Sequence, residues 1–256
     1  MELIFDHTLG KQEQQDLVIC KPMAIVDQDE EAEALDRGWL GLDYPVTDRE
    51  VFYQSRSTRI NIDLYKPRYK RHEYDGQELG IKVIDASEMV KLLSLPYIYK
   101  QYMKRKQFGA DYDPFAHYHK RDQFMIFYLG TADNIVGFTK QKRYRYQESN
   151  YHTIDDFDSQ DLAGLESVIH ANTVPISDIT LDMEIDWAQN NYVRYFYMGS
   201  GYELSSEYKA NYKGFEWWTG TEWSTNKKQY RKLCRRDSKI ESLRDLGNLS
   251  LIADKT

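Results

Sequence analysis

The chain has 256 residues, of which 41% are hydrophobic and 29% charged, and this composition excludes wholesale disorder. Because the start lacks a basic segment followed by an apolar run, and no apolar stretch is long enough to cross a bilayer, we expect a cytoplasmic protein without a membrane partner. The two cysteines, Cys20 and Cys234, lie in unrelated surroundings, which predicts free thiols and no structural zinc.

The first half of the chain alternates between helical and extended patterns. Residues 29–39 (DEEAEALDRGW) predict a helix with an acidic start that ends at Gly38. Residues 50–65 are rich in aromatic and branched side chains, which predicts an extended segment. Residues 87–106 predict a pair of helices broken at Pro96.

The second half predicts a sheet with a helix packed on it. Residues 123–147 form the clearest hairpin, which turns through residues 130–134. Residues 180–191 fit both a strand alternation and a helix face, and we choose helix because residues 192–199 then form the next strand. The fold class expected is α+β, with a mixed, mostly antiparallel sheet flanked by helices. Because no repeat or flexible linker interrupts the chain, we expect a single compact unit over residues 1–256.

Basic residues are concentrated in four runs, although the net charge is -7. Each run is interleaved with tyrosine, and the runs cover residues 66–74, 100–106, 140–146 and 227–236. A single charge run is typical of a solvated face, but the shared basic and aromatic texture favours a polyanion as partner.

The last basic run has helical spacing. On a helix one stripe would carry Lys228, Arg231, Arg235 and Lys239, together with Lys232 and Arg236. This stripe suits a phosphate backbone and predicts tRNA binding. The alternative is an ordinary surface helix whose other face packs inward.

An aromatic stretch with a glycine break resembles a known family. The residues of "YFYMGSGYELSSEYKANYKGFEWW" that carry the resemblance are Tyr197, Gly199, Tyr208, Lys209, Ala210 and Glu216. They fall on the C-terminal signature of arginyl-tRNA–protein transferases and their bacterial leucyl-transferase relatives. Upstream, the family's Ser-Arg-Ser-x-x-Arg element matches Ser55, Arg56, Ser57 and Arg59. These elements, with a Gly-Trp segment and a Tyr-Lys-x-Tyr helix, occur in family order over residues 35–223.

The sequence also departs from the family pattern. The family carries a cysteine cluster where this chain has only "PVTDR" between Tyr44 and Glu50, so we expect the metal-binding or cluster-binding N-terminal function to be absent. The family's Ser-Leu-Gly is replaced by Pro175, Ile176 and Ser177.

The resemblance implies the acyltransferase fold shared with N-acetyltransferases (GNAT-like), in which adjacent strands splay around the acyl donor. It divides the chain into an N-terminal region (1–75), an acyltransferase-like core (76–225) and a basic C-terminal helix and tail (226–256). The glycine-rich pyrophosphate motif of acetyltransferases is not found after the predicted strand at 134–146. We therefore expect aminoacyl-tRNA as donor substrate and no cofactor.

The chemistry implied is attack of an amine on an activated ester. A base must remove a proton from the amine, and donors must stabilise the oxyanion. Tyr202 and Tyr208 are candidate donors, and Glu203 and Glu216 are candidate bases. The glycine break, at Gly199 and Gly201, would let the backbone approach the ester.

Further residues are assigned to substrate binding. Lys209 would hold the terminal phosphate beside Tyr197, although a solvated lysine and core aromatics at 197 and 208 are the alternatives. Trp217, Trp218 and Trp223 would stack on unpaired 3′ bases or fill the core. The arginines of the upstream element, Arg56 and Arg59, would bind an acidic acceptor residue or tRNA phosphate. His117 and His119 have no third ligand nearby, so no metal site is predicted.

The sequence thus predicts an aminoacyl-tRNA-dependent transferase that forms an amide, with protein N-termini as acceptors and with tRNA and an acceptor protein or peptide as partners. Three alternatives stay open. They are an acyltransferase with another carrier, a catalytically silent tRNA-binding or protein-binding relative, and an aminoacyl transferase acting on a small molecule or modified nucleic acid.

Overall fold

The structure is a computed structural model, and it describes most of the chain. The described residues are 1–12, 15–42, 50–89, 92, 94–106, 115, 122–146, 149–154, 176–202 and 204–238. Side chains are described for these residues except 4–21, 103–106, 145–146 and 149–154.

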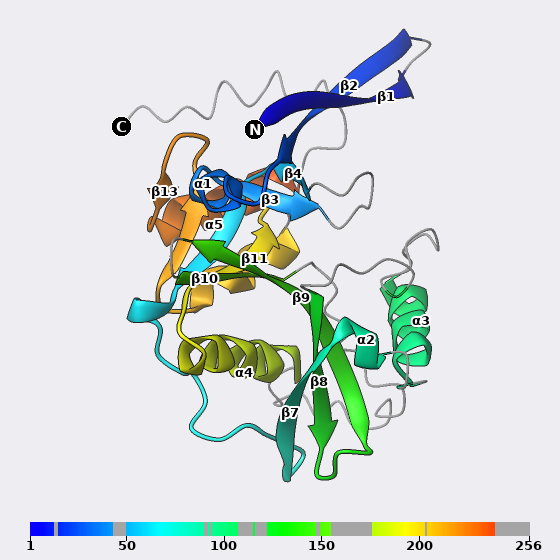
Figure 1. The fold of residues 1–256 in the computed structure, drawn as a ribbon. Coiled ribbons are helices and arrows are strands. Elements are labelled where there is room, and N and C mark those ends of the chain that lie inside the picture. Colours follow the sequence, from blue (N-terminus) through cyan, green and yellow to red (C-terminus); the bar gives the residue numbers. More distant parts are fainter. Residues whose placement is uncertain are drawn as a thin grey trace.

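The strands form two sheets (Figure 1). The smaller sheet is antiparallel, with the strand order β1-β2-β4-β3. Its strands are β1 (Glu2–Gln12), β2 (Gln15–Val26), β3 (Trp39–Leu42) and β4 (Glu50–Gln54). The chain then leaves this sheet at Ser55 and Arg56, since β5 already belongs to the larger sheet.

Over the residues that the structure describes, the larger sheet has nine strands in the order β13-β12-β5-β11-β10-β9-β8-β7-β6. Its strands are β5 (Ser57–Asn61), β6 (Glu73–Tyr74), β7 (Gln77–Asp85), β8 (Asp122–Leu129), β9 (Ile135–Tyr146), β10 (Ser149–Ile154), β11 (Val193–Ser200), β12 (Phe215–Trp218) and β13 (Trp223–Ser224).

One pair in the larger sheet is parallel. Strands β10 and β11 pair from Asn150 with Val193 to Thr153 with Tyr197, and the described pairs around them are antiparallel. The chain between these two strands includes a helix, so the strand, helix, strand order is confirmed. The fold class α+β with a mixed, mostly antiparallel sheet is confirmed as well. The GNAT-like arrangement is not confirmed, because these parallel strands stay hydrogen-bonded rather than splayed over the residues described.

The helices match the sequence predictions with one exception. They are α1 (Glu31–Asp36), α2 (Ala86–Met89), α3 (Ser94–Lys106), α4 (Ile176–Asn190) and α5 (Lys227–Asp237), with the short 3₁₀ segments η1 (Ile62–Leu64) and η2 (Leu204–Asn211). The helix at 29–39 ends before Gly38 as expected, with φ of 75° at that glycine. The ambiguous segment 180–191 is helical within α4. No helix among the described residues is long and apolar enough to span a membrane.

The exception is the position of the break in the 87–106 pair. Pro96 lies in the first turn of α3 instead of between two helices. A proline is tolerated there because the amide groups of the first turn have no partner inside the helix. The break between α2 and α3 therefore comes before the proline, around Leu92.

Helices cover both faces of the larger sheet. Strand β8 shows this best: Phe124 and Ile126 pack with α2 and α3, while Met125 and Phe127 pack with α4. At the other end of the sheet, α4 and α5 share a cluster with β5, β11 and β12. The opposite face there is covered by α1 and the smaller sheet, which pack against Tyr144 and Tyr197. Figure 1 shows the β1–β2 hairpin extending away from these layers.

Candidate functional site

Three residues predicted from separate parts of the sequence meet on the larger sheet. Arg59 lies on β5, opposite Tyr197 of β11 and Glu216 of β12. The Arg59 Nε donates to Glu216 Oε2 at 2.7 Å, and its Nη1 lies 3.3 Å from the Tyr197 hydroxyl. Strand register therefore brings these side chains to one point on the face covered by α1.

The Arg59 guanidinium is also stacked between aromatic rings. Its central carbon lies 3.7 Å from the centroid of the Tyr195 ring and 3.9 Å from that of Trp223. Arg194 lies over the same Tyr195 ring at 5.2 Å. Arg59 thus contacts the rings of both Tyr195 and Trp223, which suits the planar guanidinium of arginine better than the ammonium of lysine.

Asp36, at the end of α1, completes this site. Its Oδ1 lies 3.4 Å from Arg59 Nη1, and its side chain is 38% exposed. Burial raises the pKa of Asp36 more than the neighbouring Arg59 and Arg194 lower it. For Arg59, burial alone would lower the pKa, but Tyr197 and Glu216 raise it, so the guanidinium stays charged. We call Asp36, Arg59, Tyr195, Tyr197, Glu216 and Trp223 the Arg59 cluster.

Sequence reasoning missed Asp36. In the sequence it belongs to an acidic helix face, and nothing local distinguishes it from Glu33, whose exposed side chain pairs with Arg37. The signal is in the fold: the Trp223 Nε1 donates to the Asp36 main-chain oxygen at 2.8 Å, which ties the end of α1 to the cluster.

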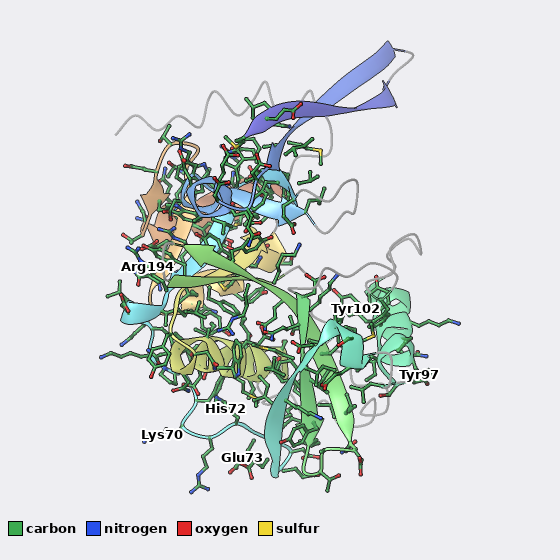
Figure 2. The ribbon with its side chains drawn as sticks, viewed as in Figure 1. Lys70, His72, Glu73, Tyr97, Tyr102 and Arg194 are labelled. Atoms are coloured by element: carbon green, nitrogen blue, oxygen red, sulfur yellow. The ribbon has the colours of Figure 1, made fainter. Side chains whose placement is uncertain are left out.

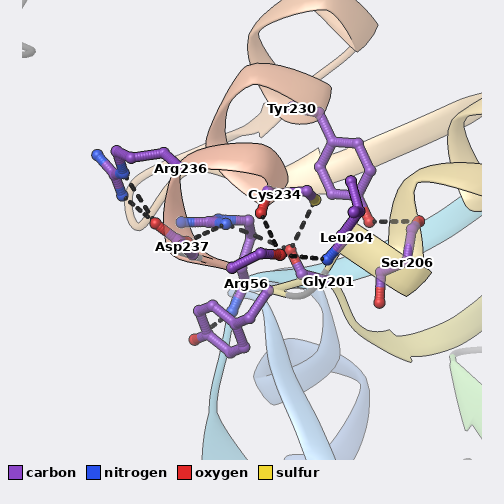
Figure 3. A network of polar contacts seen from close by, with 10 residues as sticks. Arg56, Gly201, Leu204, Ser206, Tyr230, Cys234, Arg236 and Asp237 are labelled. Carbon is purple, nitrogen blue, oxygen red and sulfur yellow. Dashed lines mark hydrogen bonds and ion pairs between the residues drawn. The ribbon is translucent and has the colours of Figure 1, made fainter. Parts of the chain in front are cut away.

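Arg56 lies at the beginning of β5 in a different network (Figure 3). Its Nη1 pairs with Asp237 Oδ2 at 2.7 Å and donates to the Gly201 carbonyl at 3.3 Å. Its main-chain N–H donates to the Tyr202 hydroxyl at 2.7 Å, and its guanidinium lies 5.0 Å from the Tyr202 ring centroid. These contacts fasten the end of β11 to α5, so Arg56 is held away from the Arg59 cluster.

The glycine break is shaped by packing against α5. A Cβ at Gly201 would lie 2.4 Å from the Tyr230 hydroxyl oxygen and 2.9 Å from Thr58 Cγ2. The Cys234 thiol is free, as predicted, and buried, and it donates to the Gly201 carbonyl at 3.4 Å, as Figure 3 shows. Gly199 has a φ of 72°, which favours glycine. Tyr230 and Thr58 therefore occupy the space beside Gly201 that the sequence predicts for the ester.

The Tyr-Lys pair divides between surface and interior. Lys209 is buried, and its ammonium donates to the Met198 carbonyl and, at 2.8 Å, to the Ser200 carbonyl. Because Lys209 is buried, the alternative of a solvated lysine is wrong. The expected phosphate contact is not supported, because the ammonium is used to hold η2 to the end of β11. Tyr208 is 37% exposed and Tyr202 is 43% exposed, so both rings reach solvent. Glu203 lies outside the described residues.

The tryptophans fill the core more than they face solvent. Trp217 and Trp218 are buried, and a Cβ at Gly38 would lie 2.2 Å from Trp218 Cγ. The burial of Trp218 against Gly38 therefore favours core filling, the alternative to base stacking, for this residue. Trp223 is partly exposed and stacks on Arg59.

The basic helix forms as predicted, but its charges are partly neutralised. Arg235 makes a bidentate pair with Glu207, at 2.6 and 3.0 Å. Arg231 donates to Asn211 Oδ1 at 3.0 Å, whereas Lys228 is exposed. Lys239 lies outside the described residues. The continuous stripe predicted from the spacing is therefore strongest at the beginning of α5.

The lysines of the basic run at 140–146 do not lie at the surface. Lys140 and Lys142 are buried on β9, where Lys140 pairs with Asp122 at 3.4 Å and Lys142 pairs with Glu50 at 2.8 Å. Burial alone would lower the pKa of Lys142, but Tyr144, Glu50 and Asp122 together raise it. The expectation of a polyanion at this run is corrected, because its lysines are matched by internal carboxylates.

Comparison with known proteins gives a distant structural likeness. No protein-family model and no curated protein matches the sequence, so the resemblance to arginyl-tRNA–protein transferases stays a prediction. A solved structure, the C-terminal domain (DUF2156) of a protein described as a lysylphosphatidylglycerol synthetase from Agrobacterium fabrum, aligns with a TM-score of 0.40 at 10% sequence identity. The alignment covers 72% of this chain and 56% of that one, so it spans little more than half of the solved chain.

No metal-binding arrangement of three or more His, Cys, Asp or Glu residues occurs among the residues described. His117 and His119 lie outside them.

Proposed function

We propose that this chain is a cytoplasmic aminoacyl-tRNA-dependent transferase that forms an amide on an amine acceptor, with the Arg59 cluster at its site. The observation that carries this proposal is the convergence of Arg59, Tyr197 and Glu216, at 2.7 and 3.3 Å, from three strands. Each of these residues falls on the family pattern in the sequence. The match to the family pattern and the contact in the fold are independent observations, because Arg59 and Glu216 are 157 positions apart in the sequence.

In the proposed reaction, an accessible side chain acts as the base and a buried one holds it in position. The amine attacks the ester carbonyl, a C–N bond forms, and the C–O bond to the tRNA 3′ oxygen breaks. The amine proton passes to a base, and the 3′ oxygen leaves as a hydroxyl after protonation. Asp36 is the base we propose, since its side chain reaches solvent and its pKa is raised by burial. Arg59 is a positioning residue, because it is buried and holds Asp36 beside Glu216.

Arg194 is proposed to hold the phosphate next to the transferred ester. Its side chain is exposed, lies over Tyr195 and acts electrostatically on Asp36. Nothing among these residues selects a protein N-terminus over another amine, so the acceptor is proposed no more narrowly than an amine.

The test is transfer of a radiolabelled amino acid from charged total tRNA to a peptide library or to small amines. We expect transfer by the wild type and a turnover about 10²- to 10⁴-fold lower for Asp36→Asn, with tRNA affinity retained. Glu33→Gln, on the exposed side of the same helix, is the matched control and should leave turnover unchanged. Transfer from acetyl-CoA but not from charged tRNA would reject the proposal.

A second candidate is a catalytically silent tRNA-binding relative. It is favoured by two specific contacts, because Tyr230 fills the approach at Gly201 and the Lys209 ammonium bonds to main-chain carbonyls. Binding of charged tRNA without transfer to any acceptor would favour this second function.

A further inference from the structure

The segment between η1 and β6 is a loop held by one buried carboxylate. Asp182 of α4 is fully buried and accepts hydrogen bonds from the Tyr65 hydroxyl at 2.5 Å and from the main-chain N–H groups of Arg68 and Tyr69 at 3.0 and 3.2 Å. The His72 Nε2 lies 3.4 Å from the same carboxylate. Burial would raise the pKa of Asp182, but these hydrogen bonds together lower it. Residues 65–72, which we call the anchored loop, are thus fixed at both ends.

The anchored loop presents cations to solvent. Its exposed basic residues are Lys66, Arg68, Lys70 and Arg71. Figure 2 shows Lys70 and His72 on the loop beside α4. Within the described part of the chain, no ion pair involves Lys66 or Lys70, whereas Arg68 pairs with Asp178 at 3.4 Å and Arg71 with Glu73 at 3.5 Å. The two lysines therefore carry most of the uncompensated charge.

Tyr212 joins the loop to the beginning of α5. The Arg68 guanidinium lies 4.9 Å from the Tyr212 ring centroid, and the Lys227 ammonium donates to the Tyr212 carbonyl at 2.5 Å. Lys228 is exposed one position further on. Arg68 of the first basic run and Lys227 of the last one, more than 150 positions apart in the sequence, thus both contact Tyr212.

We infer that the anchored loop and the beginning of α5 form a surface that binds the phosphate backbone of tRNA. This inference rests on the proposed function, since tRNA is its substrate. Charge complementarity favours a polyanion, and the fixed main chain lowers the ordering cost of binding it. The loop is also close to the proposed site in sequence, because β5, which carries Arg59, continues through η1 directly into it.

The first test measures binding by fluorescence anisotropy with uncharged tRNA. For Lys66→Glu/Lys70→Glu we expect at least about tenfold weaker binding at low salt, and a log-log salt slope less negative by about 2. The charge control is a pair of single variants, Lys70→Glu on the loop and Lys82→Glu at an exposed position of β7 outside the basic runs, which change the net charge equally. Equal weakening by both variants would overturn the surface, because binding would then depend on net charge alone.

The second test separates the anchor from the charge. Asp182→Asn removes one negative charge, so non-specific electrostatics predicts tighter tRNA binding, whereas loss of the fixed loop predicts weaker binding. We expect weaker binding, by about threefold to tenfold. Tyr65→Phe removes one hydrogen bond to the anchor without a change of charge, and we expect a smaller effect in the same direction. Unchanged or tighter binding by Asp182→Asn, or by Tyr65→Phe if the first variant fails to fold, would overturn the role of the anchor.

The two proposals fail in different ways. If wild-type protein binds tRNA and the Lys66→Glu/Lys70→Glu variant binds it equally well, the surface is rejected and the transferase remains. If binding depends on the loop but no amino acid is transferred, the transferase is rejected and the surface remains. Absence of tRNA binding by the wild type rejects both.

Discussion

Residues 66–72 and 140–146 each have four lysines or arginines and at least one tyrosine, yet their lysines lie in opposite environments. The first segment belongs to the anchored loop, whose lysines are exposed. The second forms the second half of β9, where Lys140 and Lys142 are buried beside Asp122 and Glu50. The difference is made by partners distant in sequence. A carboxylate binds the main chain of the loop and leaves its cations outside, while two carboxylates neutralise the cations of the strand.

The largest effect on stability is expected for a buried lysine of β9. Lys142→Met removes the cation paired with Glu50 and leaves Asp122 with Lys140, and we expect a loss of roughly 3–5 kcal/mol in the free energy of unfolding. The measurement is urea unfolding at pH 7. Lys66→Met on the anchored loop is the control and should stay within about 0.5 kcal/mol of wild type. Equal effects at the two lysines would contradict the contrast between them.

The pH dependence of the free energy of unfolding tests a second ionisable group in the interior. Glu184 of α4 accepts from Thr139 Oγ1 at 2.7 Å, and burial raises its pKa from 4.5 to about 8. The folded state therefore keeps a proton that the unfolded chain releases, so this contribution to stability is full below about pH 4.5 and is lost as the pH rises toward 8.

The matched variant for this series is Glu184→Gln, which cannot titrate. Relative to this variant, wild type should lose up to about 1.4 kcal/mol per pH unit between pH 5 and 7. Parallel stability curves for the two proteins in urea would contradict a protonated Glu184.

The smallest effects are expected for ion pairs nearer the surface. Side chains of Arg56 and Asp237 are 12% and 13% exposed, whereas that of Arg235 is 64% exposed in its pair with Glu207. Double-mutant cycles to alanine should give a coupling of roughly 1–3 kcal/mol for the first pair and below about 1 kcal/mol for the second. A larger coupling energy for the Arg235–Glu207 pair than for the Arg56–Asp237 pair would show that exposure does not determine the strength of these ion pairs.

Local pattern was sufficient for most of the secondary structure. The hairpin at 123–147, the helix ending at Gly38 and the helix at 180–191 are confirmed. The last of these helices was identified from its neighbour, since a strand at 192–199 requires a crossover before it. Pro96 was misplaced because a proline reads the same in sequence whether it breaks a helix or begins one.

Sequence reasoning predicted only part of the candidate site. Arg59, Tyr197 and Glu216 were singled out individually, but their meeting depends on the register of β11, β5 and β12. Asp36 was missed, and Lys209 was expected at a phosphate although its ammonium bonds to main-chain carbonyls. A residue type gives the chemistry a side chain can perform, whereas its partners decide which part of that chemistry remains free.

The sequence by itself determined the α+β class, the main hairpin, the order of helices and strands and the identity of the chemically capable residues, because these depend on periodicity and residue type over short stretches. Only the tertiary structure decided which basic run is exposed, that Trp218 is core and that Asp36 joins Arg59. The physical reason is that burial and charge pairing depend on groups brought together from far apart in the chain. The pairing of Lys142 with Glu50, 92 positions away, leaves no trace in the residues around either one.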